Sequence, residues 1–336
     1  MKLPPGKIPI DVLRDTVFKN LGVSRGEVVL GPTVGVDGAV LDIGDNSVIV
    51  SMDPITGAVE RIGFEAVNVN ANDVATFGVQ PAFIFSCIML PEGASSDVVE
   101  NISVQMGKAA AELGIAIVGG HCETTPNLVN PIVVCCIMGL AKKGEYVTAA
   151  GARVGDCLIL TKSAGIEGAA ILATDKEAQL LEVLSVETVQ AAKDFYTQIS
   201  VVKDALTAYN VGGVHAMHDP TEGGVLNGIH EMADAAKLGV RVFEDKIVVA
   251  PETMEICRYF KIDPLQLISS GALLIAAEPK SALGIIEVLK REGISAAIIG
   301  EFNDDVENRV FELNTEYTHV LPRPVSDHLW TALLSH

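Results

Sequence analysis

The sequence predicts a two-domain protein of the α/β (α+β) class, and three observations support this prediction. The chain has 336 residues, which is longer than a single hydrophobic core usually sustains. Short runs rich in Val and Ile, at 47–51, 82–90, 115–118 and 132–138, alternate with longer segments of helical period. Hydrophobic residues make up 49% of the chain and aromatic residues only 5%, which is typical of a compact aliphatic interior.

In the first half, the Val- and Ile-rich runs are the expected strands, and an apolar stretch over 62–77 is the expected helix. After residue 140 the composition changes to small and polar residues, which continue to Arg153. We therefore expect the first domain to span 1–145 and the second to span 146–336.

The second half is expected to open with a strand at 157–160. A turn containing Gly165 and Gly168 then leads into an Ala-rich helix. Further helices are expected over 186–208, 223–238 and 281–291, with strands near 240, 273 and 296. The alternation predicts a second layered α/β domain.

The formal net charge of −19 argues against a nucleic-acid backbone as partner, because 24 basic residues offer no cluster to neutralise phosphates. A polyphosphate ligand would need bridging cations, and carboxylates are the oxygen ligands that Mg²⁺ prefers. The acidity of the chain is therefore compatible with nucleotide binding through magnesium.

The sequence also predicts a reducing, cytoplasmic setting. The six cysteines contain no CxxC pair and lie mostly in apolar runs, which predicts buried free thiols. Residues 1–10 lack the apolar stretch of a signal peptide. The longest apolar run, 131–141, falls short of the roughly 20 residues that span a bilayer, so we expect no membrane association.

Standard phosphate-binding loops are missing from the sequence, since it contains neither GxxxxGK[ST] nor a GxGxxG after a predicted strand. Two aspartates stand instead at the ends of apolar elements. Asp37 precedes Gly38 and a predicted strand, and Asp53 follows the strand residues 48–50 and precedes Pro54. Both positions are also typical of plain turns, and that alternative stays open.

A polar cluster interrupts the helix predicted over 62–77. Asn68, Asn70, Asn72 and Asp73 are poor helix formers within an otherwise apolar stretch. A spacing of three places Asn70 and Asp73 on one helix face, where an amide and a carboxylate could share a metal ion or a ligand. The alternative is a solvated helix face.

Gly119, Gly120 and His121 follow the strand expected at 115–118. We expect them to form a loop in which the glycines let a ligand approach the backbone. The alternative for His121 is an ordinary surface residue.

Asp219, Pro220 and Glu222 fit the N-cap, N1 and N3 positions of a helix that continues through Gly223 and Gly224. This capping arrangement needs no ligand. Helix amino termini also bind phosphates, so a cap and a binding site are compatible here.

The order of these segments resembles the AIR-synthase-related (PurM-like) superfamily, and the resemblance covers nearly the whole chain. Segments 6–9 and 53–61 are most similar to its HypE-like (hydrogenase expression/formation protein) branch. The family motifs and the segments similar to them are GDDAAV with 35–40, a strand-end TD with 52–53, NxSDxxxMG with 70–78, GGDT or GGHT with 119–122, and DPTRGG with 219–224.

The resemblance implies a PurM-like fold in which the amino-terminal sheets of two copies pair into a dimer barrel, followed by a carboxy-terminal α/β sandwich domain. It implies ATP and Mg²⁺ as cofactors, and phosphoryl transfer from ATP to an amide or phosphate oxygen of a small substrate. The residues that it implies for the metal are Asp37, Asp53, Asp73, Asp219 and His121. Those that it implies for ATP or its phosphates are Asn70, Asp73, Gly119, Gly120, His121, Gly223 and Gly224.

Three positions depart from the family pattern. Val36 replaces the first aspartate of GDD, and Glu222 replaces the arginine of DPTRGG. The sequence ends in Ser335 and His336, whereas HypE ends in a cysteine, which speaks against authentic HypE chemistry. The departures favour, as an alternative, a non-catalytic nucleotide-binding or assembly module in metalloenzyme (hydrogenase) maturation, with a maturation protein as partner.

Overall fold

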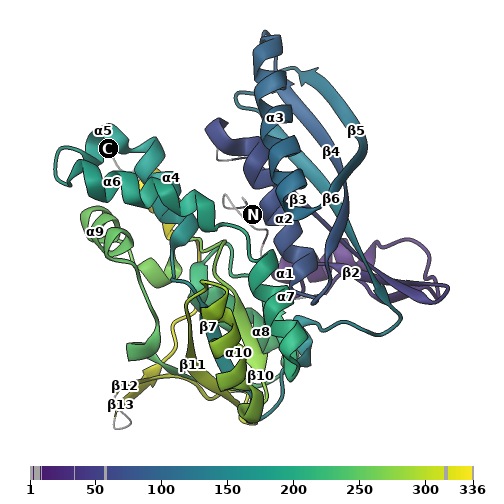
Figure 1. Ribbon diagram of the computed structural model, residues 1–336, viewed down its shortest axis with the longest axis vertical. Coiled ribbons are helices and arrows are strands. Elements are labelled where there is room, and N and C mark those ends of the chain that lie inside the picture. The colour runs from purple at the N-terminus through teal and green to yellow at the C-terminus, as the bar shows by residue number, and fades with distance from the viewer. Residues whose placement is uncertain are drawn as a thin grey trace. The chain divides into compact units, whose positions relative to one another are not determined.

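The computed structural model describes residues 3, 8, 10–33, 35–56, 59–313 and 317–334. The chain forms two compact units (Figure 1). The smaller unit consists of Glu27–Gly31 and Asp37–Tyr146, and the larger unit consists of Met1–Gly26, Pro32–Val36 and Val147–His336. The chain passes from the smaller unit to the larger unit after Tyr146.

The smaller unit is built on a six-stranded sheet with the strand order β1-β2-β3-β6-β4-β5. β4 and β5 pair in parallel, and the other neighbours pair antiparallel. The strands are β1 (Val28–Leu30), β2 (Ala39–Ile43), β3 (Asn46–Ile55), β4 (Pro81–Pro91), β5 (Ala116–Thr125) and β6 (Ile132–Lys142). Each of the four Val- and Ile-rich runs coincides with or overlaps one of these strands.

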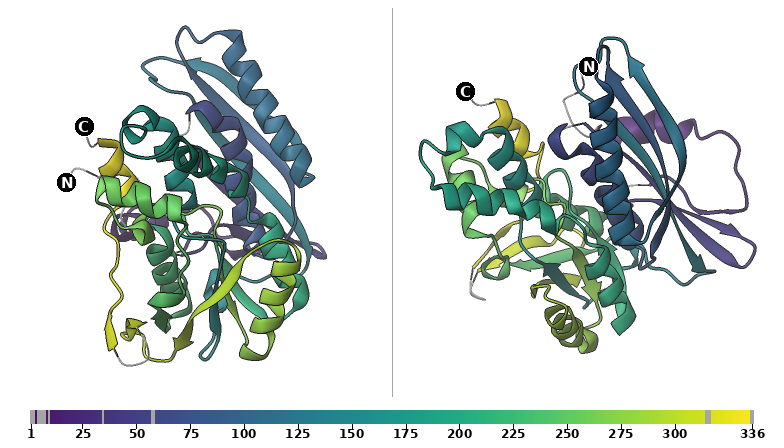
Figure 2. Two further views of the ribbon diagram at one scale, coloured as in Figure 1. Left: turned by 60° about the vertical axis from the view of Figure 1, so that its left-hand side comes forward. Right: turned by 45° about the horizontal axis from the view of Figure 1, so that its top comes forward.

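Two helices, α2 (Ile62–Ala75) and α3 (Ser96–Leu113), cover one face of this sheet, and the short helix η2 (Val59–Arg61) leads into α2 (Figure 2). The helix predicted over 62–77 is thereby confirmed. The two helices approach closely at Gly63, where a Cβ atom would lie 2.4 Å from the carbonyl oxygen of Ile102. α2 is buried along almost its whole length because it lies between β3, β6 and α3.

The opposite face of the six-stranded sheet is apolar. Strand register places Met52, Cys136 and Phe85 side by side in one row across this face, with Phe83 and Met138 in the next. Met52 is 61% exposed and Phe85 is 41% exposed in the described part of this unit. This face therefore offers a broad hydrophobic surface.

The larger unit contains a seven-stranded sheet with the order β13-β12-β9-β11-β7-β10-β8. β9 and β12 pair in parallel, and the other neighbours pair antiparallel. The strands are β7 (Cys157–Thr161), β8 (Val214–His218), β9 (Gly239–Phe243), β10 (Leu274–Ala277), β11 (Ala296–Asn303), β12 (Arg309–Leu313) and β13 (Tyr317–Val320).

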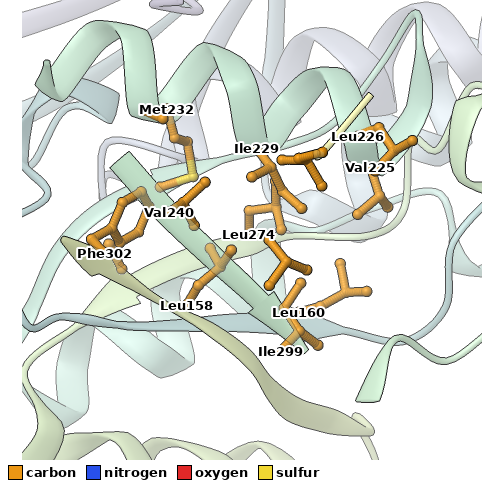
Figure 3. Close-up of a cluster of buried hydrophobic side chains, with 14 of the residues drawn as sticks. Leu158, Leu160, Val225, Leu226, Ile229, Met232, Val240, Leu274, Ile299 and Phe302 are labelled. Atoms are coloured by element: carbon orange, nitrogen blue, oxygen red, sulfur yellow. The ribbon is translucent and has the colours of Figure 1, made fainter. Parts of the chain in front are cut away.

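The larger unit also contains α-helices and short 3₁₀ helices. The α-helices are α1 (Ile10–Asp15), α4 (Ile166–Asp175), α5 (Glu177–Leu180), α6 (Val186–Lys193), α7 (Val202–Val211), α8 (Gly224–Ala236), α9 (Pro251–Phe260), α10 (Pro279–Arg291) and α11 (His328–Leu334). The 3₁₀ helices are η1 (Val17–Lys19), η3 (Ala149–Gly151), η4 (Asp194–Gln198), η5 (Glu244–Lys246) and η6 (Pro264–Gln266). A hydrophobic core lies between α8 and the sheet, where Ile229 and Met232 face Leu158, Leu274 and Phe302 (Figure 3).

The helix predicted over 186–208 is wrong as one continuous element, because α6, η4 and α7 share this stretch. The chain leaves helical geometry between Gln198 and Val202. Because the helix is interrupted here, the carbonyl oxygens of Gln198 and Ser200 lie outside the helical hydrogen-bond pattern. Lys162 Nζ donates to both of them, at 3.1 Å and 2.8 Å. A side chain distant in sequence therefore stabilises the interruption.

All six cysteines are free thiols, but only part of their predicted burial is confirmed. Cys135 and Cys257 are buried, and burial raises the pKa of each thiol to about 12. Cys122 is exposed because it lies on β5, an edge strand. Among the helices of the described residues, none combines the length and the apolar character that a membrane span requires.

Candidate functional site

Ser51, which the sequence analysis did not single out, links two of the predicted aspartates within the smaller unit. Its Oγ lies 2.7 Å from Asp73 Oδ2 and 2.6 Å from the backbone oxygen of Asp37. A serine hydroxyl has one hydrogen to donate, so the two acceptors compete for the same donor. The carboxylate of Asp73 and the bend that carries Asp37 are thereby held at one point of β3.

Asp53 is a strand residue, so its interpretation as a turn is wrong. It pairs with Cys135 of β6, and β2 leaves β3 after Val50. The backbone of Asp53 consequently has no strand partner on that side. Asn70 replaces one: its Oδ1 accepts the Asp53 N–H at 2.9 Å, and its Nδ2 donates to the Asp53 carbonyl oxygen at 3.3 Å.

Asn70 therefore holds the backbone of Asp53. Its Nδ2 also donates to the carbonyl oxygen of Ala66 at 2.9 Å, and its side chain is fully buried. With both ends of the amide engaged by backbone groups, Asn70 fixes Asp53 instead of presenting an open donor to a ligand.

The polar cluster of α2 is buried, so the alternative of a solvated helix face is wrong. Asn68, Asn70, Asn72 and Asp73 are each at most 4% exposed. Asn70 and Asp73 both direct their side chains to β3, as their spacing of three predicts. Buried polar groups are tolerated only with hydrogen-bond partners, and β3 supplies these partners through Ser51 and Asp53.

The segment Gly119, Gly120 and His121 is not a loop but the middle of β5. Its parallel pairing with β4 continues through Gly120, which lies opposite Ser86. A Cβ atom on Gly120 would lie 2.0 Å from the carbonyl oxygen of Ser86, whereas one on Gly119 would meet the ring of Phe85 at 3.3 Å. Close approach of two strands thus accounts for Gly120 without a ligand.

We expect Gly120→Ala to destabilise the protein by about 1–3 kcal/mol, because its methyl group would push β5 away from β4. Gly119→Ala is the matched control and should cost clearly less, since a ring can move where a strand backbone cannot. Urea unfolding of both variants measures the difference. Equal stabilities would show that the pairing of β5 does not depend on the small residue at position 120.

His121 lies apart from the aspartates of the smaller unit. Asp53, Cys135, Ser86 and Gly120 form one row across the sheet, so β5 lies three strand spacings, about 14 Å, from β3. His121 Nε2 lies 3.1 Å from Glu123 Oε2, and this contact is the main cause that lowers the pKa of Glu123. Within this unit, the structure does not bring His121 to the other predicted ligands.

The capping arrangement predicted for Asp219 is also wrong. α8 begins at Gly224, five residues later, with Gly223 as the N-cap in a left-handed conformation (φ +83°). Asp219 is 1% exposed and lies directly after β8 in the larger unit. Gly224 must be small because a Cβ atom there would lie 2.5 Å from the carbonyl oxygen of Leu265.

The amide of Gly223, a predicted phosphate contact, binds a carboxylate of the protein itself. Gly223 N–H donates to Asp327 Oδ2 at 2.6 Å, and Leu329 N–H donates to Asp327 Oδ1 at 2.7 Å. Asp327 thus joins the start of α11 to the start of α8. A phosphate at Gly223 would have to displace this carboxylate.

A second buried carboxyl group, Glu167 in the first turn of α4, lies near Asp327. The pKa of Glu167 is raised to about 7, mainly by burial and in addition by the negative charges of Asp327 and Glu222, while hydrogen bonds with Ser270 oppose the shift. Burial likewise raises the pKa of Asp327 to about 6. Compared with the unfolded chain, folding therefore shifts both groups toward the protonated form.

We expect Glu167→Gln to stabilise the protein by up to about 3 kcal/mol at pH 8 and to have little effect at pH 4. The folded state keeps a proton that the unfolded chain releases near pH 4.5, so wild-type stability falls as the pH rises from about 4.5 to 7. Urea unfolding at several pH values measures this slope. Glu182→Gln, at an exposed position of the same unit, is the control, and identical slopes in wild type and Glu167→Gln would contradict the expectation.

Sequence reasoning missed Ser51 and Asp327. Ser51 could have been found, because it lies two residues before Asp53 and alternation places both on the same face of a strand. Nothing in the local sequence connects Asp327 with Gly223. The segments 6–7, 9, 57–58 and 335–336, which entered the comparison with the HypE-like branch, lie outside the described residues.

Two family models match consecutive parts of the chain. The model for the amino-terminal domain of AIR synthase related proteins matches residues 35–141, and the model for their carboxy-terminal domain matches residues 153–312. Together they cover most of the chain.

Curated relatives resemble the chain over most of its length. A Methanocaldococcus jannaschii protein, provisionally named a hydrogenase expression/formation protein, is 26% identical over 304 residues, 88% of each chain. The carbamoyl dehydratase HypE of Rhizobium leguminosarum is 28% identical over 263 residues, 76% of this chain and 72% of the relative.

Solved structures share the fold. A crystal structure of a HypE–HypF complex superposes with a TM-score of 0.79 at 21% identity, over 93% of this chain and 99% of the other. HypE in complex with ATP superposes with a TM-score of 0.74 at 23% identity, over 97% and 98% of the two chains. The predicted PurM-like α/β fold is confirmed by these superpositions. In the described single chain, the six-stranded sheet is open and does not close into a barrel.

Proposed function

The chain belongs to the AIR synthase related protein family and is HypE-like, and from this premise we propose that it binds ATP through Mg²⁺. Asp37, Asp53 and Asp73 of the smaller unit are the proposed magnesium ligands, together with Asp219 of the larger unit. We further propose that the protein transfers a phosphoryl group from ATP to an amide or phosphate oxygen of a small substrate.

The arrangement around β3 is the observation that most supports this proposal. Ser51 hydrogen-bonds the carboxylate of Asp73, and Asn70 fixes the backbone that carries the carboxylate of Asp53, so this part of the site is built before any ligand binds. Their oxygen donors suit a hard cation such as Mg²⁺, which usually binds proteins through one or two carboxylates and completes its shell with water and phosphate oxygens. Phosphoryl transfer depends mainly on such positioning and charge neutralisation.

Similarity to HypE in complex with ATP motivates the choice of nucleotide. Isothermal titration calorimetry with ATP and Mg²⁺ tests the proposal. Binding that needs the metal is expected, and the absence of heat at millimolar ATP, in folded protein, would contradict the proposal. For the remaining predicted ligands, His121, Gly119, Gly120, Gly223 and Gly224, the contacts found within each unit favour structural roles.

A homodimer is part of the proposal. The apolar sheet face around Met52, Phe83 and Phe85 is a surface that a second copy of the chain could cover by pairing its own sheet. Analytical ultracentrifugation at micromolar concentrations tests this part. A dimer supports it, and a monomer contradicts it.

A second candidate function is a non-catalytic nucleotide-binding or assembly module in hydrogenase maturation. Two observations favour it: Asp327 occupies the amide of Gly223, and Glu222 places a further carboxylate where the family pattern has an arginine. The solved HypE–HypF complex suggests a maturation protein as the partner. ATP binding without release of ADP would favour this candidate, whereas steady ADP release with a small amide or phosphate acceptor would exclude it.

A further inference from the structure

His218 and Asp219 are consecutive residues at the end of β8, and both are 1% exposed. A ring nitrogen of His218 and a carboxylate oxygen of Asp219 lie within 4.8 Å of each other. This upper limit is compatible with two ligands of one metal ion, which lie at most about 4.4 Å apart when each is about 2.0–2.2 Å from the ion.

A carboxylate from α8 holds the imidazole of His218. Glu231 Oε2 lies 2.9 Å from His218 Nε2, and Glu231 is itself largely buried, with 17% of its side chain exposed. In the neutral ring, donation of the Nε2 hydrogen to Glu231 leaves the lone pair on Nδ1. A carboxylate that binds one ring nitrogen while the other faces a metal is the usual support of a histidine ligand, because it fixes the tautomer and raises basicity.

The chemistry of this donor set differs from that of an all-oxygen magnesium site. Mg²⁺ prefers carboxylate, phosphate and water oxygens, whereas an imidazole nitrogen favours divalent transition metals. The proposed magnesium ligands of the smaller unit, Asp37, Asp53 and Asp73, are all carboxylates. The larger unit adds a nitrogen donor directly before Asp219.

We infer that His218 binds a divalent transition-metal ion together with Asp219, that Glu231 is the positioning residue of His218, and that the protein consequently prefers Mn²⁺ to Mg²⁺. The inference deepens the proposed function, because it assigns the metal preference of the Asp219 end of the proposed nucleotide site. From the sequence alone, Asp219 could also have been the cap of a helix.

The test uses Mn²⁺ as the probe on the full-length protein, with and without ATP. Pulsed electron paramagnetic resonance of bound Mn²⁺ is expected to show coupling to a nitrogen-14 nucleus, which carboxylate and water ligands do not produce. His218→Gln should remove this coupling and weaken Mn²⁺ binding about 10- to 100-fold, while Mg²⁺-supported ATP binding changes much less. Glu231→Gln, which can still accept the hydrogen bond, should weaken Mn²⁺ binding about 10-fold and retain the coupling.

His215→Gln is the matched control. His215 lies on the same strand and also pairs with a buried carboxylate, since its Nδ1 lies 2.9 Å from Asp156 Oδ2, but no aspartate follows it in the sequence. This variant should bind Mn²⁺ as the wild type does. The wild-type spectrum tests the inference even if His218→Gln does not fold.

Bound Mn²⁺ without nitrogen coupling in the wild type would overturn the inference, and so would unchanged coupling in folded His218→Gln. Absence of Mn²⁺ binding would overturn it as well. Absence of ATP binding with either metal is a separate result: it would contradict the proposed nucleotide function, whereas nitrogen-coupled Mn²⁺ would still support the metal ligand assigned to His218.

Discussion

Asp73→Asn is expected to weaken Mg²⁺-dependent ATP binding at least about 100-fold, or about 2.8 kcal/mol. The substitution removes a negative charge from the proposed metal site, and the affinity of such sites depends strongly on the number of charged ligands. Asparagine can still accept the hydrogen bond from Ser51, so the connection between α2 and β3 should persist. Isothermal titration calorimetry with ATP and Mg²⁺ measures the loss.

Asp97→Asn is the matched control, because it removes one carboxylate charge at an exposed position of α3 in the same unit. Its ATP affinity should equal that of the wild type. Urea unfolding shows whether Asp73→Asn has kept its fold. Wild-type affinity in folded Asp73→Asn would show that the carboxylate serves only to accept the hydrogen bond from Ser51.

The polar cluster of α2 could be recognised in the sequence, because four poor helix formers in an apolar stretch destabilise a helix unless their side chains make specific interactions. The sequence could not show that the cluster is buried. Whether an asparagine on a helix faces water or a strand depends on a partner distant in sequence, and Ser51 and Asp53 are that partner. Helical periodicity gave the common direction of Asn70 and Asp73, but it did not give the surface that they face.

Asp53 illustrates why a strand was mistaken for a turn. Proline is normally a poor residue for a central strand, so Pro54 indicated a chain reversal. The register shows that β2 ends its pairing at Val50, and the final residues of β3 pair only with β6. Proline is tolerated in such an edge segment, and the same missing neighbour leaves the backbone of Asp53 open to Asn70.

The two glycine-containing motifs were misplaced for a related reason. A glycine pair has the same appearance in a ligand-binding loop and at a close contact between two chain segments. Gly120 is required by the carbonyl oxygen of Ser86, and Gly224 by that of Leu265. Both partners are more than thirty residues away, so local turn and capping rules could not detect them.

Lys162 contacts residues distant in sequence, and these contacts contribute to stability. We expect Lys162→Met to destabilise the protein by about 3–5 kcal/mol. Lys162 Nζ lies 3.1 Å from Asp204 Oδ1 and 2.9 Å from the carbonyl oxygen of Gly271, in addition to its bonds to Gln198 and Ser200. Burial lowers the pKa of Lys162, while the charge of Asp204 opposes this effect. Methionine keeps the approximate length of the side chain but leaves Asp204 as an uncompensated buried charge.

Urea unfolding of two further variants separates the causes of this loss. Lys203→Met removes an exposed ion pair with Glu292, at 2.9 Å, and should cost at most about 1 kcal/mol. Adding Asp204→Asn to Lys162→Met should recover part of the stability, because the buried charge is then gone while the amide oxygen can still accept from Thr161 Oγ1. If Lys162→Met costs no more than Lys203→Met, the lysine does not stabilise the interruption between η4 and α7.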